Sequence, residues 1–317
     1  MTYLPVNATT DTIPVTKEHY NHGLTLIAQG KAALLTLAGG QGSRLGFEHP
    51  KGMYVCDFNT PKSIFQMTAE RIQRIQELAS QHSQIENVII HWFLMTNEET
   101  TEEINEFFRK NNYFGLNEEQ IHTFPQGMLP MIDESGNVLY EAKDKPYMAP
   151  NGHGGMFKAL YDHKMIELMK EKGILYSIAH NVDNILCKDV DPNMIGYMDT
   201  LQSEICIKIV KKSYAAEKVG ILVEDEKKVK VIEYSELTDE LNAQKENGEF
   251  VYGCGHISIN GYSTAFLEKV AQIQLPYHIA KKRVPYMNEN GEIVHPTTNN
   301  GIKRECSSLM FSHRLKK

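Results

Sequence analysis

The sequence predicts an α/β fold with a doubly wound, Rossmann-like mixed sheet. Short apolar runs that suit buried strands alternate with segments of helical periodicity up to residue 179. A glycine-rich loop directly follows the first of these strands, and a later group of strand-like segments occupies 205–259. Alternating strands and helices imply a sheet covered by helices on both faces. The later strands predict an antiparallel or mixed extension beside a ligand site.

The first part of the chain supplies the alternating pattern. Residues 1–15 have the composition of an extended arm, rich in threonine, asparagine and proline. Dense apolar runs predict buried strands at 32–38, 88–95, 121–124 and 174–179. Four helices are predicted. The first starts at a cap at Thr16 and runs toward Gly30, and the second starts at Ser63. The third runs from a cap at Asn97 through Phe108, and the fourth covers 156–171 and is closed by Gly173.

The second part of the chain is richer in strands. We predict strands at 205–210, 220–223, 229–234 and 250–259, followed by a helix through Val270. Turn residues at 134–137 and 288–291 indicate two hairpins. Asp191 followed by Pro192 is typical of a helix start, and Asp189 is expected to be a turn or cap residue.

The composition restricts the class of protein. A chain of 317 residues with 41% hydrophobic residues can bury the core of one large or two modest domains. The net charge of −7 gives no electrostatic reason to bind nucleic acid or an anionic membrane. No apolar run approaches the roughly 20 residues that span a bilayer, and the first residues lack a signal-peptide pattern. We therefore expect a cytoplasmic protein, and the sequence leaves its oligomeric state open.

Cysteine and histidine spacing does not predict a zinc site. The five cysteines are scattered at positions 56, 187, 206, 254 and 306, and the thirteen histidines include no H-E-x-x-H motif. We expect reduced, mostly buried thiols and no histidine-ligated metal.

The glycine-rich loop is the first candidate for a binding site. Gly39, Gly40 and Gly42 follow the first strand, and the cations Arg44 and Lys51 come soon after. Glycine permits turns that point backbone N–H groups at an anion, and the two cations can bind phosphate. The loop lacks the Gly-Lys-Ser/Thr ending of a P-loop, and it misses the G-x-G-x-x-G spacing by one residue. It predicts a site for polyphosphate.

This loop and several later segments resemble the signature of the eukaryotic-type UDP-N-acetylhexosamine pyrophosphorylases, in the UDP-sugar pyrophosphorylase family. The family pattern L-x-G-G-x-G-T/S-R-L-G and the P-K-G after it match 37–46 and 50–52. The further matches, in chain order, are FPQGMLP from Phe124, MAPNGHGG from Met148, VDNIL from Val182, VIEYSEL from Val231, LPYHIAKK from Leu275 and NGIKRE from Asn300. Their order along most of the chain makes the resemblance specific.

The resemblance implies the fold of the sugar nucleotidyltransferases, with a sugar-binding β extension. On this basis we expect an N-terminal arm and helix over 1–30 and a catalytic domain over 31–305. A short divergent tail over 306–317 stands where the family continues into a C-terminal domain.

The resemblance also implies a reaction in which UTP and N-acetylglucosamine 1-phosphate form UDP-N-acetylglucosamine and pyrophosphate. The attacking sugar phosphate is ionised at neutral pH, so catalysis needs positioning and charge neutralisation rather than a general base. The implied catalytic residues are Arg44 and Lys51, with the loop backbone as a clamp on the leaving group. The implied nucleotide-binding residues are Leu37, Gly39, Gly40, Gln41, Gly42, Gln126, Gly127, Asn151, Gly152, Gly154 and Gly155.

Asp183 is the predicted metal ligand. It comes just after a buried strand, between Asn181 and Asn184, and Mg²⁺ prefers such hard oxygen ligands. The aspartate of the family's V-D-N motif has this role, so the resemblance implies Mg²⁺, with Mn²⁺ as the alternative ion. From the residues alone, Asp183 could instead cap the next turn.

The resemblance implies a set of sugar-binding residues: Gly220, Glu233, Gly255 and His256. His256 replaces a family asparagine, and an imidazole offers one donor and one acceptor at most, so this contact is expected to differ. His153 also replaces an asparagine, in the second glycine loop. The chain reaches Lys317 without the later family lysine that meets the phosphates.

We weigh three functions. The first is the uridylyltransferase described above, with glucose 1-phosphate or N-acetylgalactosamine 1-phosphate as alternative substrates. The second is a degenerate family member that binds nucleotide or sugar without turnover, which the missing lysine and the two histidines favour. The third, a purely structural domain, leaves the ordered matches unexplained. The expected partners are UTP and a hexosamine 1-phosphate, with no nucleic acid and no membrane.

Overall fold

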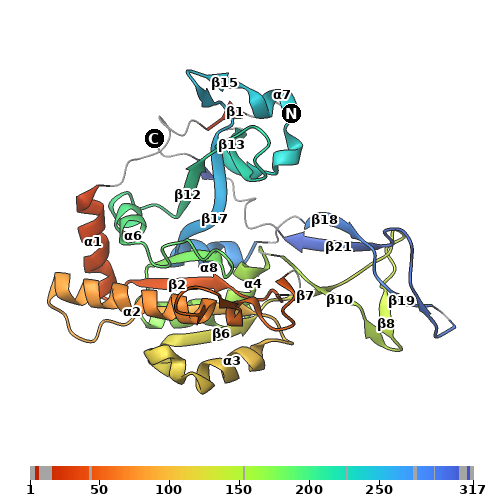
Figure 1. Ribbon diagram of the computed structural model, residues 1–317, viewed down its shortest axis with the longest axis horizontal. Helices are drawn as coiled ribbons and strands as arrows, with labels where there is room; N and C mark the ends of the chain where they lie inside the picture. Colours follow the sequence, from red (N-terminus) through yellow and green to blue (C-terminus); the bar gives the residue numbers. More distant parts are fainter. Residues whose placement is uncertain are drawn as a thin grey trace.

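A ten-stranded mixed sheet runs through the protein (Figure 1). The computed structural model describes residues 4–6, 16–42, 45–152, 154–225, 228–273, 277–288, 290–306 and 313–314. The strands of the sheet are β1 (Leu4–Pro5), β2 (Ala32–Leu37), β5 (His91–Thr96), β6 (Ile121–Pro125), β11 (Tyr176–Asn181), β12 (Ile205–Lys211), β13 (Gly220–Asp225), β14 (Lys228–Ile232), β17 (Cys254–Ser263) and β22 (His313–Arg314). Their order is β22-β14-β13-β17-β11-β2-β5-β6, with β1 beside β13 and β12 beside β17.

The sheet has a parallel half and an antiparallel half. β11, β2, β5 and β6 pair in parallel, whereas β17 pairs antiparallel with β11 and carries the sheet on toward β12, β13 and β14. Parallel strands need crossover connections, and the helices between these strands supply them. The predicted doubly wound mixed sheet with a β extension is confirmed.

Helices cover both faces of the parallel half. The helices are α1 (Lys17–Ala28), α2 (Ile64–Ser83), α3 (Thr101–Lys110), α4 (Gly155–Asp162), α5 (Met165–Glu171), α6 (Pro192–Thr200), α7 (Asp239–Ala243) and α8 (Thr264–Ala271). Leu34 of β2 packs with α1, α2, α3 and α6, and the next residue, Leu35, packs with α4, α5 and α8 on the opposite face. Both leucines are fully buried. Among the helices that the structure describes, none is long and apolar enough to cross a membrane.

The predicted helix starts are confirmed where a side chain caps the first turn. Thr16 Oγ1 accepts from the His19 N–H at 3.3 Å before α1. Ser63 Oγ accepts from the Gln66 N–H at 3.1 Å before α2. Asp191 caps α6 in the same way, with Pro192 as its first residue. These side chains satisfy backbone N–H groups that have no partner inside the helix.

Two helix predictions were wrong in detail. Helix α3 begins at Thr101 rather than directly after Asn97, because the Asn97 side chain accepts from the Thr100 N–H at 2.8 Å and stabilises a turn before the helix. The predicted helix over 156–171 is divided into α4 and α5. Lys164, at φ 58°, has a left-handed conformation that an α-helix cannot continue through. The strand predicted at 88–95 starts later, as β5.

A second group of short strands forms an arm on the right of Figure 1. Its strands are β7 (Met128–Pro130), β8 (Tyr140–Ala142), β9 (Lys145–Pro146), β10 (Met148–Pro150), β18 (Tyr277–Lys282), β19 (Tyr286–Met287), β20 (Ile293–Val294) and β21 (Gly301–Cys306). A small core of Met131, Leu139, Ala149 and Val284 holds the arm together. The hairpin predicted at 134–137 is confirmed by the bridge between Ile132 and Val138. The remaining short strands are β3 (Val55–Cys56), β4 (Lys62–Ser63), β15 (Lys245–Glu246) and β16 (Glu249–Phe250).

A histidine pair on β5 and β6 predicts how stability depends on pH. His91 Nδ1 lies 3.0 Å from His122 Nε2, and the rings stack with their centroids 5.2 Å apart. Burial lowers the pKa of His122 to about 4, assisted by His91 and Lys172, and burial also lowers the pKa of His91. Because both rings take up protons more readily in the unfolded chain, the contribution of this pair to stability is greatest above pH 6.5 and falls as the pH drops from 6.5 toward about 4.

We expect the free energy of unfolding, measured by urea titration between pH 7 and pH 4, to fall by up to about 3 kcal/mol through His122. His122→Gln should flatten this dependence, whereas the surface variant His82→Gln should keep the wild-type profile. An unchanged profile in His122→Gln would show that other groups cause the loss.

Candidate active site

The carboxyl edge of the parallel strands gathers the predicted site residues. Leu37, at the end of β2, lies opposite Asn181 of β11 and Met95 of β5. The segments that leave these strands therefore start side by side. They begin with Gly39 after β2, Asn97 after β5, Gln126 after β6 and Asp183 after β11. Ligands of open α/β sheets bind at this edge, beyond the strand ends.

The glycine loop folds back on itself before reaching Lys51. The Lys51 N–H donates to the Gly40 carbonyl at 3.1 Å, and Gln41 forms an isolated bridge with Pro50. The Gly42 N–H donates to the His49 carbonyl at 3.0 Å, so it does not have the predicted role of a free phosphate donor in this conformation. Arg44, the other predicted catalytic cation, lies outside the described residues.

Lys51 and Asp183 form an ion pair at the centre of the site. Lys51 Nζ lies 2.7 Å from Asp183 Oδ2, and their side chains are 25% and 50% exposed. A Cβ placed on Gly40 would lie 3.6–3.8 Å from the end of the Lys51 side chain, so that side chain passes directly over the loop. The structure thus brings together the predicted catalytic cation, the predicted metal ligand and the glycine loop.

Gln126 lies against the first glycine of the loop. Its side chain is 7% exposed, and its backbone N–H donates to the Thr96 carbonyl at 2.9 Å. A Cβ on Gly39 would overlap the Gln126 amide nitrogen, so only glycine allows this approach. Asn97, which sequence reasoning used only as a helix cap, donates from Nδ2 to the Gly39 carbonyl at 2.8 Å. The signal for this contact was its position at a strand end, which it shares with Asp183.

The second glycine loop packs around the Asn151 side chain. The Asn151 N–H donates to the Gly127 carbonyl at 3.1 Å, and a Cβ on Gly155 would overlap the Asn151 amide. The Asn151 side-chain oxygen is buried and has no hydrogen-bond partner in the part of the chain that the structure describes. An unpaired buried acceptor costs free energy, so this oxygen is a weak point of the loop packing in this conformation.

The backbone N–H groups at the start of α4 are already engaged. The Gly154 N–H donates to the Cys306 carbonyl at 2.8 Å, and the Gly155 N–H donates to the Gly152 carbonyl at 3.0 Å. The Gly154 and Gly155 N–H groups are therefore not free to bind an anion in this conformation. Gly152, at φ 82°, supplies the left-handed turn that this arrangement needs. His153 lies outside the described residues.

The predicted sugar residues lie together on the β extension. Gly220 of β13 pairs with His256 of β17, and Gly255 pairs with Ile221. Glu233 is exposed and directly follows Ile232, the partner of Ile221, so it lies at the same end of the ladder. His256 is 6% exposed, and its Nε2 lies 3.0 Å from Asn260 Oδ1.

The predicted sugar-binding residues and the predicted metal ligand are connected through one amide. Asn184, next to Asp183, donates from Nδ2 to the Ile257 carbonyl at 3.3 Å. Ile257 follows His256, at a point where β17 is irregular: Ser258 has φ 57° and the β12–β17 register shifts nearby. This irregularity of β17 lies where the strand contacts Asn184, the residue next to Asp183.

The chain belongs to the nucleotidyltransferase family described as UTP–glucose-1-phosphate uridylyltransferase, whose model matches residues 3–307. It is 40% identical over 287 residues to the UDP-N-acetylhexosamine pyrophosphorylase-like protein 1 of Xenopus tropicalis, covering 89% of this chain and 56% of that protein. It is 38% identical over 295 residues to the UDP-N-acetylglucosamine pyrophosphorylase of Saccharomyces cerevisiae, covering 91% of this chain and 61% of that protein.

A solved structure shows the same fold at higher identity. A crystal structure of an Entamoeba histolytica protein, named provisionally as a UDP-N-acetylglucosamine pyrophosphorylase, is 71% identical and superimposes with a TM-score of 0.89. The match covers 96% of this chain and 76% of that protein. The chain spans little more than half the length of the Xenopus and yeast relatives.

The glycine after Lys51 provides a test of how closely the site is packed. A Cβ on Gly52 would overlap the ring of Phe65, which is fully buried. We expect Gly52→Ala to lower the free energy of unfolding by about 1–3 kcal/mol, because the ring cannot move away without disturbing the core. The matched variant Gly40→Ala adds only ordinary contacts with Lys51 and should change stability by less than about 0.5 kcal/mol. Equal effects in urea denaturation would contradict this difference.

Proposed function

We propose that this chain is a uridylyltransferase that forms UDP-N-acetylglucosamine and pyrophosphate from UTP and N-acetylglucosamine 1-phosphate. The observation that carries the proposal is the convergence of Lys51, Asp183 and Gln126 around the glycine loop at one edge of the sheet. The family membership and the names of the Xenopus and yeast relatives support the same chemistry.

The reaction requires charge neutralisation more than proton transfer. The sugar phosphate attacks the α-phosphorus of UTP, the bond to the β-phosphate oxygen breaks, and pyrophosphate leaves. Lys51, at the end of the glycine loop, is positioned to stabilise negative charge on the phosphates. This role requires that Lys51 exchange its ion pair with Asp183 for a pairing with the substrate.

Asp183 is the residue that would hold a divalent cation, Mg²⁺ or, alternatively, Mn²⁺. The fit rests on the chemistry of the carboxylate: it is half exposed, it projects at the ligand edge, and it already accepts a cation, the Lys51 ammonium group, at 2.7 Å. Hard oxygen ligands suit Mg²⁺, which commonly combines one or two carboxylates with substrate phosphates. Such an ion supplies positive charge to phosphate oxygens when it is bound.

Two amides are suited to recognise the nucleotide. The Gln126 side chain can donate and accept, as an edge of uracil does, and its burial against Gly39 limits its orientation. The unpaired Asn151 oxygen can accept from a base or ribose donor. On the sugar side, Glu233 is exposed and can accept from hydroxyl groups, while His256 is held by Asn260.

We also propose that the chain works in the cytosol, on UTP and a hexosamine 1-phosphate that it binds from solution. The support is chemical: Cys56, Cys187, Cys206, Cys254 and Cys306 are all free, as expected of a reducing compartment.

The test is pyrophosphate release from UTP and N-acetylglucosamine 1-phosphate in the presence of Mg²⁺. We expect Lys51→Met to lower kcat by about 10²–10³-fold, because one stabilising donor is lost from the transition state. The matched control is Lys62→Met, which removes a lysine of similar exposure that pairs with Glu70 on α2 and should leave kcat within a few-fold of the wild type. Equal rates in the two variants would contradict the role of Lys51.

The metal ligand is tested separately with Asp183→Asn. We expect this variant to lose turnover and to require far more Mg²⁺ or Mn²⁺ for its residual rate, because an amide is a weaker ligand than a carboxylate. Parallel assays with glucose 1-phosphate and N-acetylgalactosamine 1-phosphate show which sugar phosphate the protein prefers. Absence of pyrophosphate release with every sugar phosphate, while UTP still raises the melting temperature, would favour the non-catalytic binding protein instead.

A further inference from the structure

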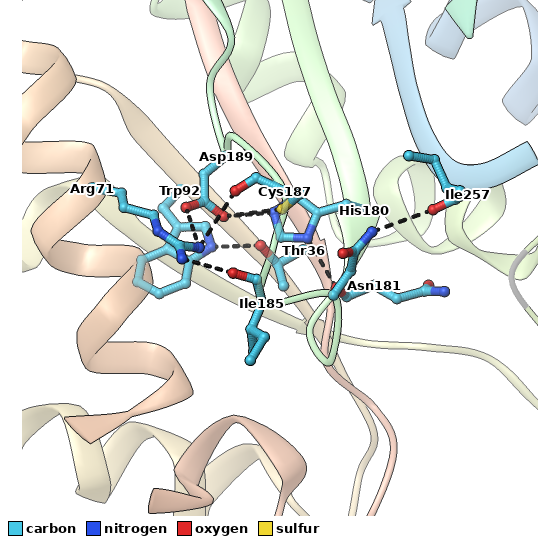
Figure 2. Close-up of polar contacts among 10 residues, drawn as sticks. Thr36, Arg71, Trp92, His180, Asn181, Ile185, Cys187, Asp189 and Ile257 are labelled. Atoms are coloured by element: carbon cyan, nitrogen blue, oxygen red, sulfur yellow. Dashed lines mark hydrogen bonds and ion pairs between the residues drawn. The ribbon is translucent and has the colours of Figure 1, made fainter. Parts of the chain in front are cut away.

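A cluster of three ligand-type side chains lies buried at the end of β11 and in the segment that follows it (Figure 2). His180 ends the buried part of β11, and Cys187 and Asp189 follow the turn. Their side chains are remote from solvent, at 3%, 5% and 3% exposure. One nitrogen, one sulfur and one carboxylate oxygen from the three residues all lie within 4.8 Å of one another. Sequence spacing gave no sign of this cluster.

The orientation of His180 places its second ring nitrogen against a buried carboxylate. Its Nδ1 lies 2.9 Å from the Asn181 carbonyl, which can only accept, so Nδ1 carries the proton. Nε2 lies 3.0 Å from Asp189 Oδ1 but makes no hydrogen bond in the described part of the chain. With a neutral imidazole, two acceptors would face each other in a dry interior. This arrangement requires a cation between them, either a proton or a metal ion.

The surrounding contacts are those that orient metal ligands. A ligating histidine commonly donates its other ring N–H to a backbone carbonyl, as His180 does. The second carboxylate oxygen of Asp189 accepts from Arg71 at 3.4 Å. Arg71 also donates to the Ile185 carbonyl at 2.7 Å and to the Cys187 carbonyl at 3.4 Å (Figure 2). The imidazole, the thiol and the carboxylate are therefore all restrained before any ion arrives.

We propose that His180 Nε2, Cys187 Sγ and an Asp189 carboxylate oxygen form a Zn²⁺ site. Nitrogen, thiolate sulfur and carboxylate oxygen are the donor set that zinc accepts, at about 2.0–2.3 Å. Cys187 Sγ lies 3.5 Å from Asp189 Oδ1, a separation that two ligands on neighbouring corners of a tetrahedron can have.

The charge balance of the buried cluster allows a zinc ion to replace two protons. Without metal, the Cys187 thiol donates to Asp189 Oδ1, and a proton on His180 Nε2 faces the same carboxylate oxygen at 3.0 Å. The group then holds imidazolium, thiol, carboxylate and the Arg71 guanidinium, with a net charge of +1 from one carboxylate and two cations. Binding Zn²⁺ releases the imidazolium proton and the thiol proton, and the net charge stays at +1. No redox step is involved.

The consequence of the site is mechanical. His180 and Asp189 stand at the two ends of the segment that carries Asp183, and Arg71 ties the same segment to α2. An ion bound by both ends would fix the conformation of this segment. The zinc site is separate from the Mg²⁺ position proposed at Asp183, because it contains sulfur and faces the core.

The experiment uses the untagged full chain, expressed in medium with added zinc. We expect about one zinc per chain by inductively coupled plasma mass spectrometry. Replacement by Co²⁺ should produce a thiolate-to-cobalt charge-transfer band. Cys187→Ala should lose both signals, and the matched control Cys206→Ala, which alters another cysteine packed against the same core, should keep both. Circular dichroism establishes that each variant is folded, and the cobalt spectrum of the unmodified chain decides the proposal if Cys187→Ala does not fold.

The pH dependence adds a second readout. Because the ligands give up protons when the ion binds, the apparent affinity should fall as the pH is lowered. Substoichiometric zinc together with a cobalt spectrum free of the charge-transfer band would overturn the proposal and leave a proton as the cation between His180 and Asp189. These measurements need no substrate, so their outcome is independent of the uridylyltransferase assay.

Discussion

The parallel pairing of β2 with β11 and β5 is the constraint on which the site depends. These strands are buried on both faces, so a shift of one residue would exchange the side chains of two different cores. The register therefore brings Leu37 level with Asn181 and Met95, and the loops that follow must emerge together. The ion pair between Lys51 and Asp183, residues far apart in the chain, is a direct result.

Close backbone approach is the second physical feature that the site uses. Because glycine has no Cβ, the Gln126 amide can lie against Gly39, the Phe65 ring against Gly52 and the Asn151 side chain against Gly155. A methyl group at any of these positions would displace its neighbour, so the glycines act by packing as well as by conformational freedom. The sequence pattern suggested phosphate binding by backbone N–H groups. Several of those groups, including Gly42 and Gly154, instead hold the loops in shape.

The segment after β11 is held by charges on both of its sides. On the solvent side Lys51 binds the half-exposed Asp183, and on the core side Arg71 and His180 surround the buried Asp189. In a protein of net charge −7, these local cations offset the charge of the two carboxylates. Breaking a buried pair leaves an uncompensated charge, which is far more costly than losing a surface pair.

The sequence by itself determined the fold class, the strand and helix order, the main caps and the loops that carry the site, because periodicity, capping and glycine patterns act over short distances. The split between α4 and α5 and the delayed start of α3 were not predictable, since the left-handed backbone at Lys164 and the hydrogen bond from the Thr100 N–H to the Asn97 side chain decided them. Only the tertiary structure decided that Asn97 contacts Gly39 and that His180, Cys187 and Asp189 meet, because register and turn geometry set distances that spacing along the chain does not contain.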